Sequence, residues 1–394
     1  MNGFAKFELP EKVIYGQNAM SQLGDVASEY GTRALVVSDR IMEKVGLVQR
    51  VTEELEKKGI SCAYYLDANT EPTDLFVADA LKVCQDEKCD LIVSIGGGSC
   101  IDTAKAVAGV ATNGGFIGDY MGGKTMAKMP ALPLIVLPTT AGTGSEVTNV
   151  TIISNTSNDV KMMIKQKAFL PKAAIVDPLL TVTTPKNVTA ATGIDALCHA
   201  VEAHISRKAQ PVTSTFALSA IGLIVKNLRN AYDNGSDLDA REKMSLASME
   251  AGIAFSNASV TLVHGMSRPI GAIFHVPHGV SNAMLLPAVL EFTKAEALDR
   301  LAEVGRVISP SANLATDEEW ADEAIHEIRK LCGYLGIPNM QTWGISREDL
   351  DKWAQKMATD AIASGSPGNT PRVPSHEEVV ALYSKCYDYD FNLN

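Results

Sequence analysis

The chain has 394 residues, of which 46% are hydrophobic, and its 46 acidic and 35 basic residues give a net charge of −11. This length is enough for two domains with complete cores, and the acidic balance excludes the basic field that nucleic acid or an anionic membrane attracts. The sequence contains no apolar run of membrane-spanning length, no signal-type core at its start and no close C-x-x-C pair among its seven cysteines. We therefore expect a cytoplasmic protein with small-molecule partners.

The first part of the chain alternates short apolar runs with helical patterns. A short strand pair is predicted at residues 7–9 and 13–15, before the first helix. Further strands are predicted at 34–37, 63–66, 91–95, 134–137 and 173–177, and helices at 49–58, 75–86 and 101–111. Strands that alternate with helices indicate a parallel sheet, and such sheets bind ligands outside the carboxyl ends of their strands.

Helical periodicity dominates from Pro185 onward. Helices are predicted at 188–206, 213–231, 240–256, 295–308 and 318–333. This change of pattern predicts a domain boundary near Thr181–Pro185. We expect a dinucleotide-binding α/β domain at residues 1–184 and a helical metal- and substrate-binding domain at residues 185–394.

Two turns rich in glycine and hydroxyl groups follow predicted strands. Gly96–Ser99 leads into the predicted helix 101–111, and Thr139–Glu146 follows the strand 134–137. Neither turn matches G-x-G-x-x-G, so the ordinary dinucleotide fingerprint is absent. One such turn alone is usually only a turn, but two of them favour a phosphate and ribose site, because main-chain N–H groups at a helix N-terminus bind anions.

Asp39 directly follows the first predicted buried strand. A carboxylate at this place can accept hydrogen bonds from a ribose 2′-hydroxyl and would repel a 2′-phosphate, which favours NAD over NADP. The same residue type is also a good N-cap for a following helix. The sequence leaves both roles open.

Asp195 and three histidines form two polar clusters in the helical half. Asp195 and His199 are four residues apart and share one helix face, while His264 and His278 lie on either side of a predicted break at Pro269 and Gly271 and a turn at Pro277–Gly279. A pair with this spacing is more often a capping or surface pair than a metal site. Here apolar neighbours predict burial, and one shared divalent cation would satisfy all four groups. Three other histidines fit surface or satisfied core positions better: His204, His326 and His376.

Five longer motifs resemble the iron-containing (group III) alcohol dehydrogenase family. They are GGGSCIDTAK (96–105), LPTTAGTGSE (137–146), AIVDPLLT (174–181), ATGIDALCHAVEA (191–203) and HVPHGVSNAMLLP (275–287). The resemblance implies a Rossmann-like parallel-sheet domain followed by an all-helical domain, the architecture that dehydroquinate synthase also has. It further implies NAD(P)-linked interconversion of alcohols and aldehydes by a homodimer or larger homo-oligomer.

The positions that match the family's motifs imply a set of site residues. The implied metal ligands are Asp195, His199, His264 and His278. The implied metal is Fe2+, and Zn2+ is also compatible with these nitrogen and oxygen donors. The implied NAD contacts are Gly96, Gly97, Gly98, Ser99, Asp102, Thr139, Thr140, Thr143, Ser145, Lys161 and Leu180, with Asp39 at the ribose.

The sequence departs from the family at two positions. Glu71 stands where many members have the asparagine of an Asn-Pro-Thr turn near the adenosine, and Arg268 stands where many have a histidine in the active-site cleft. On a helix, Arg268 would project from the same face as His264, where a guanidinium can pair with a polar or acidic group of a substrate. We take Arg268 as a candidate catalytic residue. It can instead bridge to a buried acid such as Glu202 or Glu250.

Together these features predict a metal-dependent, NAD-linked alcohol dehydrogenase or aldehyde reductase. Its substrate would be a small primary alcohol, a diol or a hydroxy acid. The alternative is a metal-dependent lyase or cyclase of the dehydroquinate synthase type, which uses NAD only transiently. That alternative needs several basic residues for a highly anionic substrate, and the region 264–286 offers only Arg268.

Overall fold

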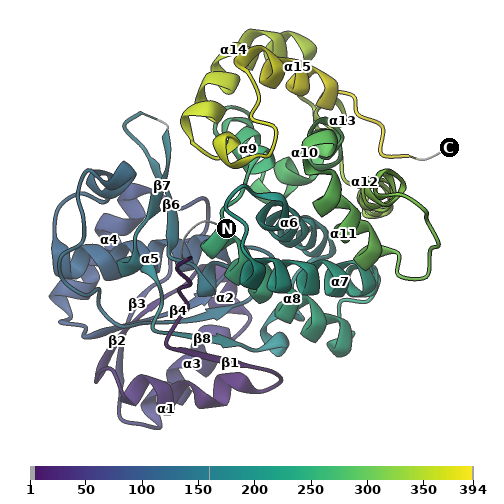
Figure 1. The fold of residues 1–394 in the computed structure, drawn as a ribbon. Coiled ribbons are helices and arrows are strands. Elements are labelled where there is room, and N and C mark those ends of the chain that lie inside the picture. Colours follow the sequence, from purple (N-terminus) through teal and green to yellow (C-terminus); the bar gives the residue numbers. More distant parts are fainter. Residues whose placement is uncertain (1–4, 159, 393–394) are drawn as a thin grey trace. The chain divides into compact units, whose positions relative to one another are not determined.

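The computed structural model describes residues 5–158 and 160–392, and these form two compact units (Figure 1). One unit is Glu8–Thr184, and the other comprises the described residues up to Phe7 and from Pro185 onward. The first unit is a parallel sheet with helices and the second is helical. The predicted fold class is therefore confirmed.

Six parallel strands form the sheet of the α/β unit, in the order β1-β8-β5-β4-β2-β3. They are β1 (Lys12–Tyr15), β2 (Arg33–Val37), β3 (Ser61–Tyr65), β4 (Leu91–Gly96), β5 (Leu134–Pro138) and β8 (Ala173–Val176). Every residue of β4, β5 and β8 is buried. Burial of both faces explains why these strands have unbroken apolar sequences.

Helices cover both faces of this sheet. They are α1 (Leu23–Ser28), α2 (Arg40–Lys44), α3 (Leu47–Glu56), α4 (Asp74–Asp86) and α5 (Gly98–Asn113). Leu35 and Val37 of β2 belong to the core shared with α4 and α5, whereas Ala34 and Val36 belong to the core shared with α1 and α3. This alternation follows from the two-residue period of a strand.

Two predictions for this unit were wrong or incomplete. Residues 7–9 do not form a strand, and Phe7 instead stacks on Phe216 in the helical unit, with ring centroids 6.1 Å apart. Of the predicted pair only β1 forms, and it pairs with β8. An antiparallel pair, β6 (Val150–Asn155) and β7 (Val160–Lys165), was missed because its half-buried residues mix apolar and polar types without a regular period.

The helical unit is built from α6 to α15. Their bounds are α6 (Lys186–Ile205), α7 (Pro211–Asp233), α8 (Leu238–Ala258), α9 (Leu262–Phe274), α10 (His278–Thr293), α11 (Leu298–Ile308), α12 (Asp317–Tyr334), α13 (Met340–Trp343), α14 (Arg347–Ala363) and α15 (His376–Cys386). Helix α6 packs against α7, α8 and α10, and its residues 193–205 are all buried. Polar side chains in that stretch must therefore find partners inside the protein.

The predicted break at Pro269 is absent. Helix α9 runs through Pro269 to Phe274, and the chain turns only at His275, which has a left-handed φ of 54°. A proline within a helix removes one main-chain hydrogen bond, but packing keeps this helix continuous, since residues 262–271 are all buried. His264 and Arg268 consequently lie on one uninterrupted helix.

Helix α7 is long and apolar enough, by length and composition alone, to cross a membrane, which the sequence reading had not recognised. In the most apolar 18-residue window of α7, 39% of the residues are buried. The buried residues Ala217, Ile221, Ile224 and Leu228 recur at spacings of three or four, and the helix packs against α6, α8 and α11. This pattern is that of an amphipathic core helix.

Candidate functional site

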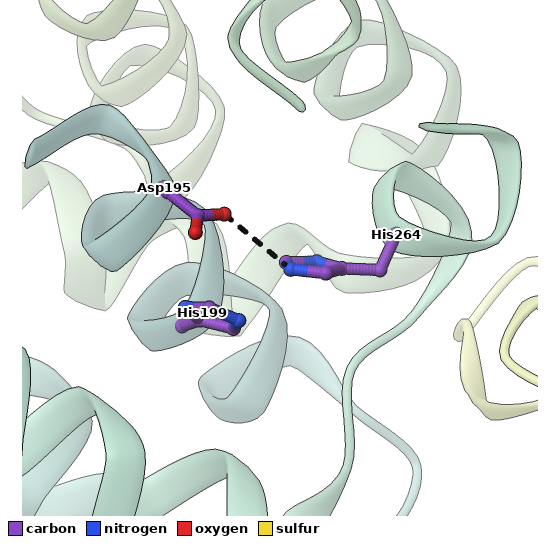
Figure 2. A group of neighbouring side chains, drawn as sticks. All are labelled: Asp195, His199 and His264. Carbon is purple, nitrogen blue, oxygen red and sulfur yellow. Dashed lines mark ion pairs between the residues drawn. The ribbon is translucent and has the colours of Figure 1, made fainter. Parts of the chain in front are cut away.

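Three buried side chains from two helices form the centre of the candidate metal site. Asp195 and His199 lie one turn apart on α6, and His264 lies on α9. One ligand atom of each residue lies within 4.8 Å of those of the others, and Nε2 of His264 is 3.6 Å from Oδ1 of Asp195. Figure 2 shows the Asp195 carboxylate and the His264 ring turned toward each other, with His199 beside them.

His278, the fourth predicted ligand, is the first residue of α10, and its ring centroid lies 5.3 Å from that of His264. The side-chain nitrogen of Asn282, one turn after His278 on α10, lies close to Asp195, His264 and His278. It lies 2.7 Å from Oδ1 of Asp195, 3.1 Å from Nε2 of His264 and 3.2 Å from Nε2 of His278. The donor atoms of these three residues therefore face one point.

The electrostatics of the cluster favour a positive charge at that point. Burial alone would raise the pKa of the Asp195 carboxyl, but the imidazoles of His199, His278 and His264 outweigh it and lower that pKa. Burial would also lower the pKa of His264, yet the carboxylates of Glu202 and Asp195 raise it to about 9. A set of one carboxylate and three imidazoles, of which only His278 is partly exposed, fits Fe2+ or Zn2+, which both accept oxygen and nitrogen donors.

Glu202 is a buried carboxylate that the sequence reading had not placed in the metal site. It lies on α6 seven residues after Asp195 and accepts hydrogen bonds from Oγ1 of Thr261 at 2.6 Å and from the main-chain N–H of Val263 at 2.7 Å. Its second oxygen is hydrogen-bonded to Nδ1 of His264. The spacing of seven, which puts Glu202 on the helix face of Asp195, is the signal that could have identified it.

Arg268 lies one turn after His264 on α9 and is buried, with 8% of its surface exposed. Its Nη1 donates a hydrogen bond to Oγ of Ser366 at 3.0 Å. Burial lowers the pKa of Arg268 to about 10, against the opposing influence of Glu202. The guanidinium therefore keeps its charge at neutral pH, and the helix that carries His264 also carries a buried cation.

The two glycine-rich turns lie side by side, because they follow the neighbouring parallel strands β4 and β5. The N–H of Thr139 donates to the carbonyl of Gly96 at 3.0 Å, and a Cβ atom at Gly98 would lie 3.0 Å from Cγ2 of Thr143. Helix α5 begins at Gly98, so its first N–H groups, which have no partner within the helix, lie at this turn. The other predicted members of the turns are Gly97, Ser99 and Thr140.

Asp102 and Ser145 belong to a hydrogen-bonded group centred on Lys105, which is fully buried on α5. The Lys105 ammonium donates to Ser145 and Thr148 hydroxyls, both at 2.9 Å, and to the carbonyl of Val150 at 2.8 Å. Ser145 donates to one oxygen of Asp102 at 2.7 Å, and the other oxygen accepts a main-chain N–H of β6 at 2.9 Å. These bonds fix the second turn to α5.

Asp39 caps helix α2. One carboxylate oxygen accepts the N–H groups of Ile41 and Met42 at 2.8 and 2.9 Å. The other oxygen lies 3.6 Å from Sγ of Cys100, in the first turn of α5. The capping role is thus present, and the second oxygen is directed to the helix start at which the sequence predicts a nucleotide.

The last two predicted cofactor residues differ in accessibility. Lys161 on β7 forms an ion pair with Glu71 at 3.1 Å, so the residue that departs from the family's asparagine has a cationic partner. Leu180 is 1% exposed and its side chain packs in the core beneath the sheet. The side chain of Leu180 is therefore not accessible to a ligand.

Comparison with known proteins gives consistent matches over almost the whole chain. Residues 10–178 match the family model described as iron-containing alcohol dehydrogenase. Residues 189–387 match the model described as Fe-containing alcohol dehydrogenase family, C-terminal. The NAD-dependent methanol dehydrogenase of Bacillus methanolicus is 36% identical over 92% of this chain and 95% of its own length.

Solved structures resemble this fold closely. A 1,3-propanediol oxidoreductase has a TM-score of 0.93 and 36% identity, over 98% of this chain and 100% of its own. The sulfoacetaldehyde reductase from Bifidobacterium kashiwanohense, solved in complex with NAD+, has a TM-score of 0.88 and 27% identity, over 99% of this chain and 100% of its own.

The geometry predicts that His278→Ala abolishes metal binding without unfolding the protein. His278 is partly exposed, and the Asn282 amide that contacts it also bonds to Asp195, whereas removal of His264 would take the imidazole partner from the buried Glu202. We expect metal affinity to fall by at least the roughly 100-fold that loss of an outer contact can cost. Elemental analysis and circular dichroism test this, with exposed His326→Ala as the control. A full equivalent of metal in His278→Ala would refute the ligand assignment.

A second prediction separates the two roles of Asp39. Asp39→Asn keeps an oxygen that can cap α2 but removes the charge that would repel a 2′-phosphate. We expect the preference for NAD over NADP, as a ratio of kcat/KM values, to narrow about tenfold, which corresponds to about 1.4 kcal/mol. Asp39→Gly should narrow it too, with a loss of stability. An unchanged ratio in Asp39→Asn would leave Asp39 as a helix cap only.

Proposed function

Because this chain belongs to the iron-containing alcohol dehydrogenase family, we propose that it is a metal-dependent, NAD-linked enzyme that interconverts small alcohols and aldehydes. The observation that carries the proposal is the convergence of Asp195, His264 and His278 on one point, with His199 beside them. Neither this site nor the relatives named above favour the lyase or cyclase alternative.

The helical unit supplies the metal-binding residues. Asp195, His199, His264 and His278 would hold Fe2+, with Zn2+ as the other compatible ion. Such an ion supplies Lewis-acid chemistry, which lowers the pKa of an alcohol hydroxyl or polarises an aldehyde carbonyl. The surrounding burial excludes water and strengthens these electrostatic effects.

The α/β unit supplies the NAD-binding residues. The turn Gly96–Ser99 and the start of α5 would bind the pyrophosphate through main-chain N–H groups, and the hydroxyls of Thr139, Thr140 and Thr143 would surround it. The dinucleotide provides the nicotinamide that accepts or donates hydride. Asp102 and Ser145 would act by holding the second turn in place, since their side chains bond to each other.

Arg268 suggests the class of substrate within this activity. The buried guanidinium of Arg268 lies on α9 one turn after His264, so a positively charged donor stands close to the candidate metal site. Such a charge favours substrates with a further oxygen or an acidic group, such as diols or hydroxy acids. The named substrate of the structurally similar sulfoacetaldehyde reductase is an aldehyde with an anionic group.

The cellular setting forms part of the proposal. We propose a cytoplasmic enzyme, supported by seven cysteines that are all free thiols, six of them buried. We also propose a homodimer or larger assembly, on the family resemblance, with no nucleic acid or membrane as partner. Light scattering of the purified chain measures the assembly directly.

The decisive test of this function is net NADH formation from a simple alcohol. Protein reconstituted with Fe2+ without oxygen, and in parallel with Zn2+, should reduce NAD at the expense of alcohols, diols or hydroxy acids. A lyase or cyclase would regenerate its NAD and show no net increase in NADH absorbance. His278→Ala serves as the matched inactive control. No net NADH with any of these substrates would refute the proposal.

Replacing Arg268 by histidine tests the substrate class. We expect Arg268→His to lower kcat/KM for a hydroxy acid about tenfold or more relative to that for an unsubstituted alcohol of the same length, because one charge-assisted hydrogen bond contributes about 1.5–3 kcal/mol. Arg268→Lys, which keeps the charge, should fall between. If the ratio of the two efficiencies stays the same in Arg268→His, Arg268 does not contact the substrate and serves to hold Ser366.

A further inference from the structure

Glu202 lies outside the proposed ligand set, yet it bonds to His264 and to two residues at the start of α9. It is completely buried, and its two oxygens bond to Thr261, Val263 and His264. We propose that Glu202 is a positioning residue that fixes both the orientation and the proton of His264, so that Nε2 is left to bind the metal. The inference rests on the proposed function, and it assigns that site a residue outside the four ligands.

The hydrogen-bond chemistry of the pair determines the tautomer of His264. An ionised carboxylate only accepts hydrogen bonds, so the Nδ1 atom that faces Glu202 must carry a hydrogen. In a neutral imidazole the other nitrogen then has the free electron pair. That nitrogen, Nε2, is the atom that faces Asp195 at 3.6 Å. Glu202 thus selects the form of His264 that can bind a cation.

The same carboxylate also fixes the start of α9. Thr261 precedes the helix and Val263 is its second residue, and the Thr261 side chain does not cap the helix. One oxygen of Glu202 accepts from the Thr261 hydroxyl and from the main-chain N–H of Val263, so Glu202 acts as the cap. Because Glu202 lies on α6, this bond ties the beginning of α9 to the helix that carries Asp195 and His199. The position of His264 relative to those ligands is set by one side chain.

Stacking completes the constraint on the His264 ring. Its centroid lies 4.4 Å from that of His199 with an angle of 29° between the planes. One edge of the His264 ring faces Glu202 and the other faces Asp195. Rotation of the ring by half a turn would place a C–H group against Glu202 and lose the Nδ1 hydrogen bond in a buried site.

Glu202→Gln tests the proposal with little change of shape. The glutamine oxygen still accepts from Thr261 and Val263, which keeps the cap, but its NH2 group then faces Nδ1 of His264. Donation from that NH2 group moves the imidazole hydrogen to Nε2. We expect metal affinity, measured by competition with a chromophoric chelator on the full chain, to fall about 10- to 100-fold. Circular dichroism should stay the same.

Glu303→Gln is the matched control. Glu303 lies 3.1 Å from Nε2 of buried His204, in the same helical unit but outside the ligand set. This change replaces an acid by an amide beside a histidine, and we expect it to leave metal affinity as in the parent. A loss of affinity in Glu202→Gln alone therefore reports the metal site and not a general effect of removing a carboxylate.

Nitrogen NMR of the histidine rings in the metal-free parent, recorded above the pKa of about 9 of His264 so that this ring is neutral, provides a second measurement that needs no variant at Glu202. The inference requires the Nδ1–H form of His264, assigned by comparison with His264→Gln. The Nε2–H form in the parent, or parent-like metal affinity in Glu202→Gln, would overturn it. These outcomes leave the proposed function standing if the parent binds metal and forms NADH, whereas a parent that does neither refutes the proposed function itself.

Discussion

The burial of charged groups on α6 is the constraint on which the helical unit depends. Residues 193–205 of this helix are all buried, yet Asp195, His199 and Glu202 lie among them on one face. An unpaired buried charge costs several kcal/mol, so each group needs a partner brought by another helix. Helix α9 brings His264 to both carboxylates, and α10 brings Asn282 and His278. The contacts that form the candidate metal site are therefore also contacts that hold α6, α9 and α10 together.

The α/β unit also contains a buried charge that needs partners, the ammonium of Lys105. A fully buried ammonium needs several acceptors, and it finds them in Ser145, Thr148 and the carbonyl of Val150, which all come from the segment after β5. Burial lowers the pKa of Lys105 to about 8, and the nearby Asp102 carboxylate opposes this shift. The second glycine-rich turn is thus held in place by a charged side chain that need not touch a ligand itself.

Local patterns of the sequence were enough to predict most of the strands, the helices α3 to α8, α11 and α12, and the four residues that lie together in the helical unit, whereas α9, α10 and α14 were not predicted. Apolar runs predicted the buried strands β4, β5 and β8, and the spacing of Asp195 and His199 predicted a shared helix face. What local patterns missed depends on contacts distant in sequence. Helix α9 continues through Pro269 where its residues are buried, and the roles of Glu202 and Lys105 appear only when segments about 40–60 residues away supply their hydrogen bonds.

Because the proposed metal ligands come from three helices, metal binding would also stabilise the fold. Asp195 and His199 come from α6, His264 from α9 and His278 from α10, so the donor atoms meet only when these helices are packed. An ion that binds the folded chain but not the unfolded one adds RT ln(1 + [L]/Kd) to the free energy of unfolding, about 2.7 kcal/mol at a free ion concentration of 100 Kd. Metal supply would then act on how long the enzyme persists in a cell, in addition to how fast it turns over.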